Sequence, residues 1–271
     1  MTNLGGRTVR QYLTHAELVE SDGLPVPSAS TGLDAIIVPA ARPAENLRTA
    51  VKLAEETAAR LVVLCSFRTH ADDVRAVLAE HKLRDLAVVE IPQECDDWIL
   101  AEFATKHWVH DGAGKGVCGA RNNDLSMKRN TGLLLARMLG WERIFFLDDD
   151  IRAITGGTVL STVSLLGADG HGYRTAGMSV EKYPDNSVVC HARRVVGEFQ
   201  DVFVSGAALA VDCRASFDFF PDLYNEDWLF FYRDAAAARL ATPGSLVEQL
   251  QYDPFADPQR AAGQEFWDVI A

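Results

Sequence analysis

Four short runs of apolar residues recur along the chain, with helical patterns in the segments between them. The runs lie at residues 33–39, 60–65, 86–91 and 144–147, and they are rich in Val, Ile, Leu and Phe. Strands that are apolar at nearly every position are buried on both faces, as in a parallel sheet with helices on each side. The pattern therefore predicts an α/β fold with a mostly parallel sheet flanked by helices.

Helix signals occupy the intervals between the runs. Pro43 suits the first position of a helix, and Glu45 would lie in its first turn. Thr69 is a candidate N-cap for a helix over residues 70–81. The helix before the last run is expected to end at Gly140, because glycine is the usual residue after a helix C-terminus.

The chain is less regular outside residues 33–150. Residues 1–32 are polar and end in a stretch rich in Ser, Pro and Gly, which predicts a loop-like lead. Residues 151–271 contain a strand pattern at 202–211 and an Ala-rich helix after Asp227. The final residues resemble a helix without a cap, which fits a truncated chain or an end that packs elsewhere. We expect residues 33–271 to form one domain with two unequal halves.

Charge and cysteine content exclude several classes of protein. The chain has 26 Lys and Arg against 38 Asp and Glu, a formal net charge of −12, which argues against binding to nucleic acid. The five cysteines are scattered without a C-x-x-C pair, so neither a disulfide framework nor a structural zinc site is expected. Neither a signal peptide nor a membrane span is apparent. These features predict a cytoplasmic protein.

Three consecutive aspartates, Asp148, Asp149 and Asp150, directly follow the apolar run 144–147. Ligands of open parallel sheets bind at the carboxyl ends of the strands, and carboxylates there suit Mg²⁺ or Mn²⁺. Because strand side chains alternate, Asp148 and Asp150 are expected to point to the same side and Asp149 to point away. The alternative is a solvated acidic turn.

Several short segments stand in order along the chain: IIVPA at 36–40, KRNTGL at 128–133, Ala136-Arg137, Gly140-Trp141, IFFLDDD at 144–150, VSGAA at 204–208 and Asn225-Glu226-Asp227-Trp228. Together they resemble the core of GT-A glycosyltransferases of the family-2 type. The resemblance covers about residues 33–235 and implies a Rossmann-like, GT-A type sheet with an appended acceptor-side lobe. Residues 33–150 would then be the nucleotide-binding half and 151–271 the acceptor-binding half.

The resemblance implies a nucleoside-diphosphate sugar as donor, lying across the strand ends. It assigns Asp148 to the ribose and to a Mn²⁺ or Mg²⁺ ion, and Asp150 to the same ion, which would act as a Lewis acid on the departing diphosphate. Lys128 and Arg129 could add cationic contacts to the phosphates, although an exposed helix face is an equal alternative. Further donor contacts are expected at Pro39, Ala40, Arg42, Ser66, Asn130 and Asp149.

Transfer with inversion needs a carboxylate that accepts the proton of the acceptor hydroxyl. The resemblance assigns this role to Asp227, with Glu226 as its neighbour. The alternative is that both residues are acidic because they begin a helix, whose dipole favours negative charge there. The acceptor, a small molecule or a glycan, is expected near Gly206, His191 and Trp228.

The chain departs from the family pattern in two places. Its second strand ends in Cys65-Ser66-Phe67-Arg68 where these enzymes commonly have an acidic pair, and no histidine after His191 can serve as a late metal ligand. We expect a metal-dependent, inverting glycosyltransferase. A sugar-phosphate nucleotidyltransferase, a haloacid-dehalogenase-like phosphatase and a non-enzymatic binding module are the alternatives.

Overall fold

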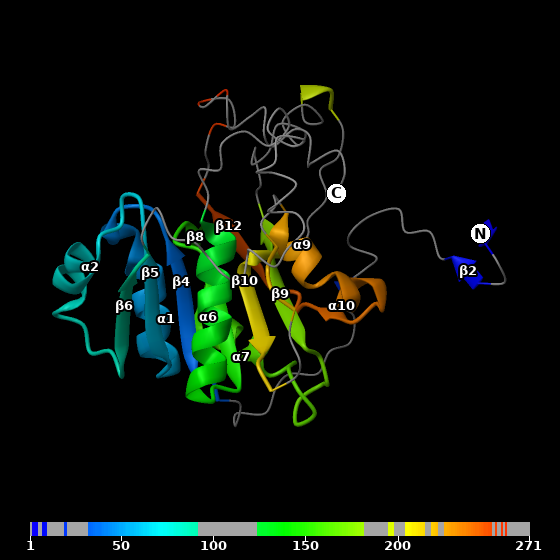
Figure 1. Ribbon diagram of the computed structural model, residues 1–271, viewed down its shortest axis with the longest axis horizontal. Helices are drawn as coiled ribbons and strands as arrows, with labels where there is room; N and C mark the ends of the chain where they lie inside the picture. Colours follow the sequence, from blue (N-terminus) through cyan, green and yellow to red (C-terminus); the bar gives the residue numbers. More distant parts are fainter. Residues whose placement is uncertain are drawn as a thin grey trace.

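A sheet of ten strands forms the centre of the part of the chain that the structure describes, and helices cover both of its faces (Figure 1). The computed structural model describes residues 32–91, 124–181, 195–197, 204–214, 218–221 and 225–250, the backbone at 2–4, 7–9 and 19–20, and residues 253, 256 and 258. The predicted α/β architecture with helices on both faces is confirmed.

Four strands and three helices match the sequence pattern within a few residues. The strands are β4 (Ala35–Ala40), β5 (Arg60–Cys65), β6 (Leu86–Glu90) and β7 (Arg143–Leu147). The helices are α1 (Arg48–Thr57), preceded by the 3-10 helix η2 (Ala44–Leu47), α2 (Ala71–Leu78) and α6 (Leu125–Leu139). Gly140 follows α6 with φ of +68°, as a C-terminal glycine should.

The second half of the described chain adds five strands to the same sheet and three helices beside it. Its strands are β8 (Ile151–Arg152), β9 (Thr175–Glu181), β10 (Val204–Asp212), β11 (Leu240–Ala241) and β12 (Leu246–Gln249). Its helices are α7 (Gly156–Val163), α9 (Glu226–Phe230) and α10 (Tyr232–Ala236).

The strand order explains why the two halves meet. Strands β6, β5, β4 and β7 are parallel neighbours, and β10 then pairs with β7 in the antiparallel direction. Beyond β10 lie β9, β11 and β3, while β12 joins β9 to β8. Because β10 runs opposite to β7, its first residues lie beside the last residues of β7. The carboxyl ends of the parallel strands β4, β5 and β7 therefore lie at the same edge of the sheet as the N-terminal end of β10.

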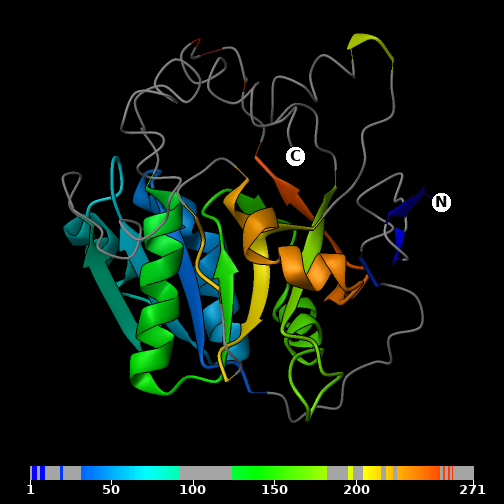
Figure 2. The same ribbon diagram turned by 45° about the vertical axis from the view of Figure 1, so that its right-hand side comes forward.

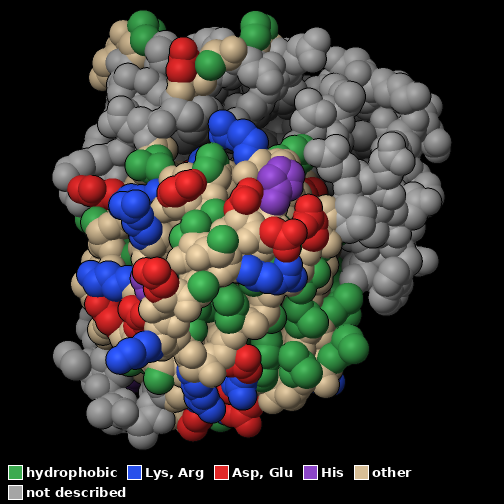
Figure 3. Space-filling view, turned by 90° about the vertical axis from the view of Figure 1, so that its left-hand side faces the viewer, with side chains coloured by type: hydrophobic (Ala, Val, Ile, Leu, Met, Phe, Trp, Pro, Cys, Tyr) green, Lys and Arg blue, Asp and Glu red, His purple; other side chains and the backbone are tan. Residues whose placement is uncertain are grey.

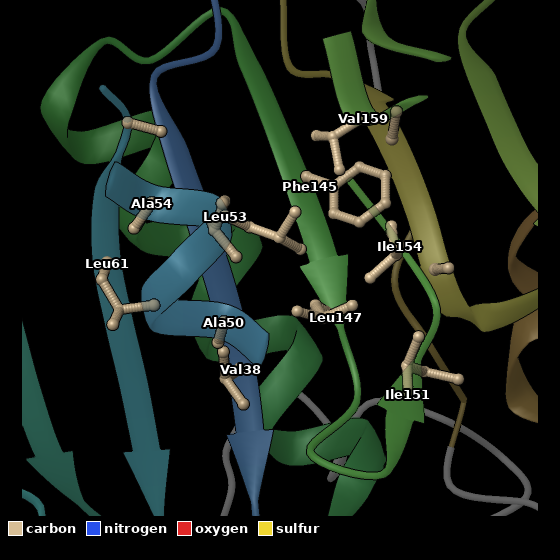
Figure 4. Packing of buried hydrophobic residues seen from close by; sticks show 14 of the residues in the cluster. Val38, Ala50, Leu53, Ala54, Leu61, Phe145, Leu147, Ile151, Ile154 and Val159 are labelled. Carbon is tan, nitrogen blue, oxygen red and sulfur yellow. The ribbon is translucent and has the colours of Figure 1, made fainter. Parts of the chain in front are cut away.

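Alternating side chains of the central strands fill two separate cores. Ile36, Val38 and Phe145 pack in one cluster with residues of α1 and α7. Figure 4 shows Val38 and Phe145 among the buried side chains of this cluster. Ile37 and Phe146, one residue further along each strand, face α6, α9 and α10 on the other side. Figure 2 shows α9 and α10 beside α6 on that face. The period of two in a strand therefore accounts for both layers of helices.

Gly132 lets α6 approach the sheet closely. A Cβ atom added at this position would lie 2.9 Å from Cε1 of Phe146 and 3.1 Å from side-chain atoms of Ile37. The glycine of the family-like segment 128–133 is thus explained by packing, because a side chain there would push the helix away from β4 and β7.

Two details differ from the sequence prediction. Thr69 does not cap α2: its hydroxyl donates to the carbonyl of Arg42, and the N-cap is His70. The N–H of Ala71, the first residue of α2, donates to the carboxylate of Glu90 at 3.3 Å. The lead also contains strands, because β1 (Thr2–Leu4) pairs with β2 (Arg7–Val9), and β3 (Val19–Glu20) pairs with β11.

The surface over α2 and β6 carries charges of both signs. Figure 3, which views the molecule from this edge of the sheet, shows Lys and Arg interspersed with Asp and Glu. None of the described helices has the length and apolar character that crossing a bilayer requires.

Candidate active site

The predicted site residues that the structure describes gather where β4, β5 and β7 end and β10 begins. The N–H of Asp148 donates to the carbonyl of Ala207 in β10, at 2.9 Å, which fixes the aspartate run beside the second half of the chain. β7 ends at Leu147, and residues 148–150 form a turn. The strand alternation expected for the three aspartates therefore does not apply, because they lie beyond the strand.

Arg42, just after β4, holds Asp149 and Asp150 together. One terminal nitrogen of its guanidinium pairs with Oδ1 of Asp149, and the other lies 2.8 Å from Oδ2 of Asp150. Oδ2 of Asp149 also accepts the backbone N–H groups of Ala41 and Arg42, each at 2.9 Å. Asp149 thus ties the end of β4 to the end of β7 and orients the arginine.

Asp150 is buried, and only one of its two carboxylate oxygens has hydrogen-bond partners among the described residues. Gln249 of β12 donates to its Oδ2 at 3.1 Å, and the backbone N–H of Leu250 donates to its carbonyl at 3.0 Å. Its Oδ1 is buried without a hydrogen-bond partner among the described residues. Burial raises the pKa of Asp150, and the positive charge of Arg42 opposes that rise.

Arg129 of α6 joins the two halves of the site. Its Nη2 lies 3.2 Å from both carboxylate oxygens of Asp148, and its Nη1 lies 2.6 Å from Oε1 of Glu226 at the start of α9. The guanidinium also lies over the ring of Phe220, 5.4 Å from the ring centroid. Two carboxylates from different halves therefore depend on one buried cation.

Burial shifts the titration of both carboxylates that Arg129 holds. It raises the pKa of Asp148 to about 6; Arg129 opposes the shift, and Asp150 and Asp149 add to it. It raises the pKa of Glu226 to about 7, again against Arg129 and with a contribution from Asp227. The desolvation of a charged group outweighs its pairing with a single arginine in both cases.

Asp227 lies nearer the surface than Glu226 and is held by the backbone. Its Oδ2 accepts the N–H of Gly206 in β10 at 2.7 Å, and its Oδ1 accepts the N–H of Trp228 at 2.8 Å. Gly206 has to be a glycine here: a Cβ would lie 2.7 Å from Nη1 of Arg129 and 2.9 Å from Cβ of Asp227. Gly206, which was predicted to contact the acceptor, therefore helps to position Arg129 and Asp227.

Lys128 is a structural lysine in this arrangement. Its side chain is 1% exposed, and its ammonium donates to the carbonyl of Ala40 at 2.7 Å and to the hydroxyl of Ser66 at 2.6 Å. It also lies 3.1 Å from a carboxylate oxygen of Asp124. An ammonium has three donors, so these partners leave none for a phosphate. The predicted phosphate contact of Lys128, and a direct donor contact of Ser66, are not supported by this geometry.

Asn130 is likewise committed inside the protein. Its amide nitrogen donates to the carbonyl of Phe220 at 2.9 Å, and its amide oxygen accepts the N–H of the same residue at 2.8 Å. It is fully buried, as are Pro39 and Ala40 in β4. All three residues are buried below the surface of the site. This burial does not support the contact with a donor that was predicted for them.

Four predicted residues remain accessible at this edge: Arg42, Asp148, Asp227 and Trp228. The ring of Trp228 packs edge-on against Phe231, with centroids 4.9 Å apart. His191, predicted near the acceptor, lies outside the described residues. Asp124 and Gln249 were missed by sequence reasoning, because no local pattern indicates that they reach Lys128 and Asp150.

The arrangement does not present Asp148 and Asp150 as free metal ligands. Both oxygens of Asp148 are bound by Arg129, and Oδ2 of Asp150 is bound by Arg42 and Gln249. Oδ1 of Asp150 is the oxygen that still lacks a partner among the described residues. The described part of the chain contains no group of three or more His, Cys, Asp or Glu side chains arranged to hold a metal ion. A divalent ion does not fit here while Arg42 keeps its position.

Comparison with known proteins identifies the architecture. No family model and no curated protein matches the sequence. Among solved structures, glucosyl-3-phosphoglycerate synthase of M. tuberculosis superposes with a TM-score of 0.54 at 14% identity, covering 96% of this chain and 85% of that one. Core-mannan synthase A of Aspergillus fumigatus, in its Mn/GDP form, gives a TM-score of 0.44 at 8% identity, over 92% of this chain and 86% of that one. The first likeness, together with the strand order and the helices on both faces, establishes a GT-A type, Rossmann-like α/β fold.

Proposed function

We propose that the protein is a glycosyltransferase that moves a sugar from a nucleoside-diphosphate sugar to an acceptor hydroxyl, with inversion. One observation carries the proposal: Arg129 binds Asp148 of the nucleotide-side half and Glu226 of the acceptor-side half, next to the accessible carboxylate of Asp227. A donor site and a base for the acceptor would thus adjoin one another.

The donor would lie across the ends of β4, β5 and β7, where open parallel sheets bind their ligands. Arg42 and Asp148 are accessible there, and they suit the two polar parts of a nucleotide. An arginine can bind phosphate oxygens through paired N–H groups, and a carboxylate can accept ribose hydroxyls. The GT-A type fold supports the same placement.

Asp227 would accept the proton of the acceptor hydroxyl. The N–H groups of Gly206 and Trp228 hold its carboxylate in one orientation without burying it. A base held in this way can approach a hydroxyl within hydrogen-bond distance as the sugar is transferred. Glu226 is buried and bound to Arg129, so we assign it a positioning role and Asp227 the catalytic one.

The phosphatase alternative requires a free aspartate nucleophile, and the geometry disfavours it. Both oxygens of Asp148 are bound by Arg129, and Asp150 is almost wholly buried. The predicted divalent ion would have to displace an arginine from each of the two aspartates. For this reason, every test of donor binding should be made with and without Mn²⁺.

A thermal-shift panel tests the proposal. The purified protein would be heated with UDP-, GDP-, ADP- and dTDP-sugars, each in EDTA and in Mn²⁺. A ligand that binds only the folded state raises the unfolding temperature, so one nucleotide class should do so and be hydrolysed slowly. The same class should have a weaker effect on Asp148→Ala. A panel in which no nucleotide sugar stabilises the protein or is hydrolysed would refute the proposal.

A further inference from the structure

Arg42 forms a bridge between two neighbouring carboxylates just after β7. Its two terminal nitrogens contact Asp149 and Asp150, one each. The backbone holds the same assembly, because the N–H groups of Ala41 and Arg42 both donate to Asp149. The carbonyl of Arg42 in turn accepts the hydroxyl of Thr69. The guanidinium is therefore held by the two aspartates after β7, and the backbone of Arg42 is held by Asp149 and by Thr69, which follows β5.

Arg42 is more exposed than the two other cations near the site, Lys128 and Arg129. Its side chain is 35% exposed, against 1% for Lys128 and 2% for Arg129. A guanidinium has five N–H donors, and the two contacts with the aspartates leave three. Arg42 can thus hold the acidic pair and bind a further anion simultaneously, which the buried Lys128 and Arg129 cannot do.

We infer that the Arg42 guanidinium is the resident cation of this site: it neutralises Asp149 and Asp150 and binds the diphosphate of the donor in place of a divalent ion. The first part, that Arg42 neutralises Asp149 and Asp150, depends only on the contacts between these three side chains. The second part rests on the proposed function, since it requires a nucleoside diphosphate as ligand.

The chemistry of the transfer is compatible with a fixed cation. As the sugar departs, the bond from its anomeric carbon to the diphosphate oxygen breaks, and negative charge grows on the diphosphate. A preorganised arginine can stabilise that charge through hydrogen bonds without any change in protonation. The acceptor oxygen forms the new bond to the sugar, and its proton passes to Asp227.

Titration calorimetry with MnCl₂ alone tests the first part. We expect the wild-type protein to show no specific Mn²⁺ site, whereas Arg42→Ala and Arg42→Gln should each gain one, because the acidic pair loses its cation. Arg68→Ala is the matched control. Its backbone N–H donates to Ala41 at 3.3 Å, but its exposed side chain forms no ion pair with any described residue. This control should gain no site.

Titration with UDP, GDP, ADP and dTDP in EDTA tests the second part. The preferred nucleotide should bind the wild type as tightly in EDTA as in Mn²⁺, and binding to Arg42→Ala in EDTA should weaken at least about tenfold. Mn²⁺ should restore part of that loss. Circular dichroism would verify that each variant folds, and Arg42→Gln replaces Arg42→Ala if the latter does not.

The outcomes separate the two claims. Stoichiometric Mn²⁺ binding by the wild type, or its absence from both Arg42 variants, overturns the inference that Arg42 is the resident cation. Nucleotide binding that needs Mn²⁺ in the wild type overturns it as well. If no nucleotide binds in any condition, the proposed function fails, and the Mn²⁺ titration still decides whether Arg42 occupies the cation position.

Discussion

Asp148 at the end of β7 and Glu226 at the start of α9 are bound to the same guanidinium, that of Arg129. The arginine is 2% exposed and its Nε lacks a partner among the described residues. It therefore compensates two largely buried carboxylates from the two halves of the chain, and the geometry of the site depends on it.

Replacement of Arg129 by methionine should be strongly destabilising. It would leave two carboxylates in a poorly hydrated environment without a cation, which typically costs about 3–5 kcal/mol of unfolding free energy. Urea denaturation measures the effect. Arg233→Met is the control, because that side chain is 81% exposed and its loss should cost less than about 0.5 kcal/mol. Equal effects of the two substitutions would contradict the role of Arg129.

Stability should fall as the pH rises from about 4 to about 7. The pKa of Glu226 is raised from its ordinary 4.5 to about 7, so the folded state binds this proton more tightly than the unfolded state. The contribution is fully present below the unfolded pKa and is lost as the pH passes the folded pKa. Glu226→Gln should remove up to about 3 kcal/mol of this decline. Parallel pH profiles of the wild type and the variant, measured by urea denaturation, would exclude the assignment.

Gly206→Ala should damage the site. The new Cβ would collide with Nη1 of Arg129 and Cβ of Asp227, at 2.7 and 2.9 Å, so those groups or the strand must shift. We expect a loss of about 1–3 kcal/mol of unfolding free energy and much weaker turnover. Gly157→Ala in α7 is the matched control, since its Cβ would meet only Oγ1 of Thr155 at 3.7 Å. Measured unfolding temperatures that leave Gly206→Ala at the wild-type value would contradict this packing.

The sheet was largely predictable because its signals are local. β4 is apolar along its length, and β5 and β7 are apolar after a first arginine, since both faces of the sheet are covered; Gly140 marks the end of α6. The short β3 was not predictable in this way: it consists of two residues, and its partner β11 lies far along the chain.

The sequence predicted which edge of the sheet carries the aspartates, but not the contacts that they make. Asp148, Asp149 and Asp150 follow β7 as expected, because the apolar run before them marks the strand. Ligand binding at this edge stays a prediction. Their orientation was predicted from strand alternation, which fails beyond Leu147. The burial of Lys128 and Asn130 depends on Ala40 and Phe220, which are far from them in sequence. Such contacts follow from the assembled fold, not from spacing within a motif.

Turnover of the nucleotide sugar selected by the thermal-shift panel, compared between wild type and Asp227→Asn, tests the account most directly. The variant should bind the donor with unchanged affinity and transfer or hydrolyse sugar about 100- to 10,000-fold more slowly, because it lacks the general base. Asp72→Asn, at a side chain 97% exposed on α2, should behave as wild type. Wild-type turnover by Asp227→Asn would contradict the proposed glycosyl transfer with Asp227 as its base.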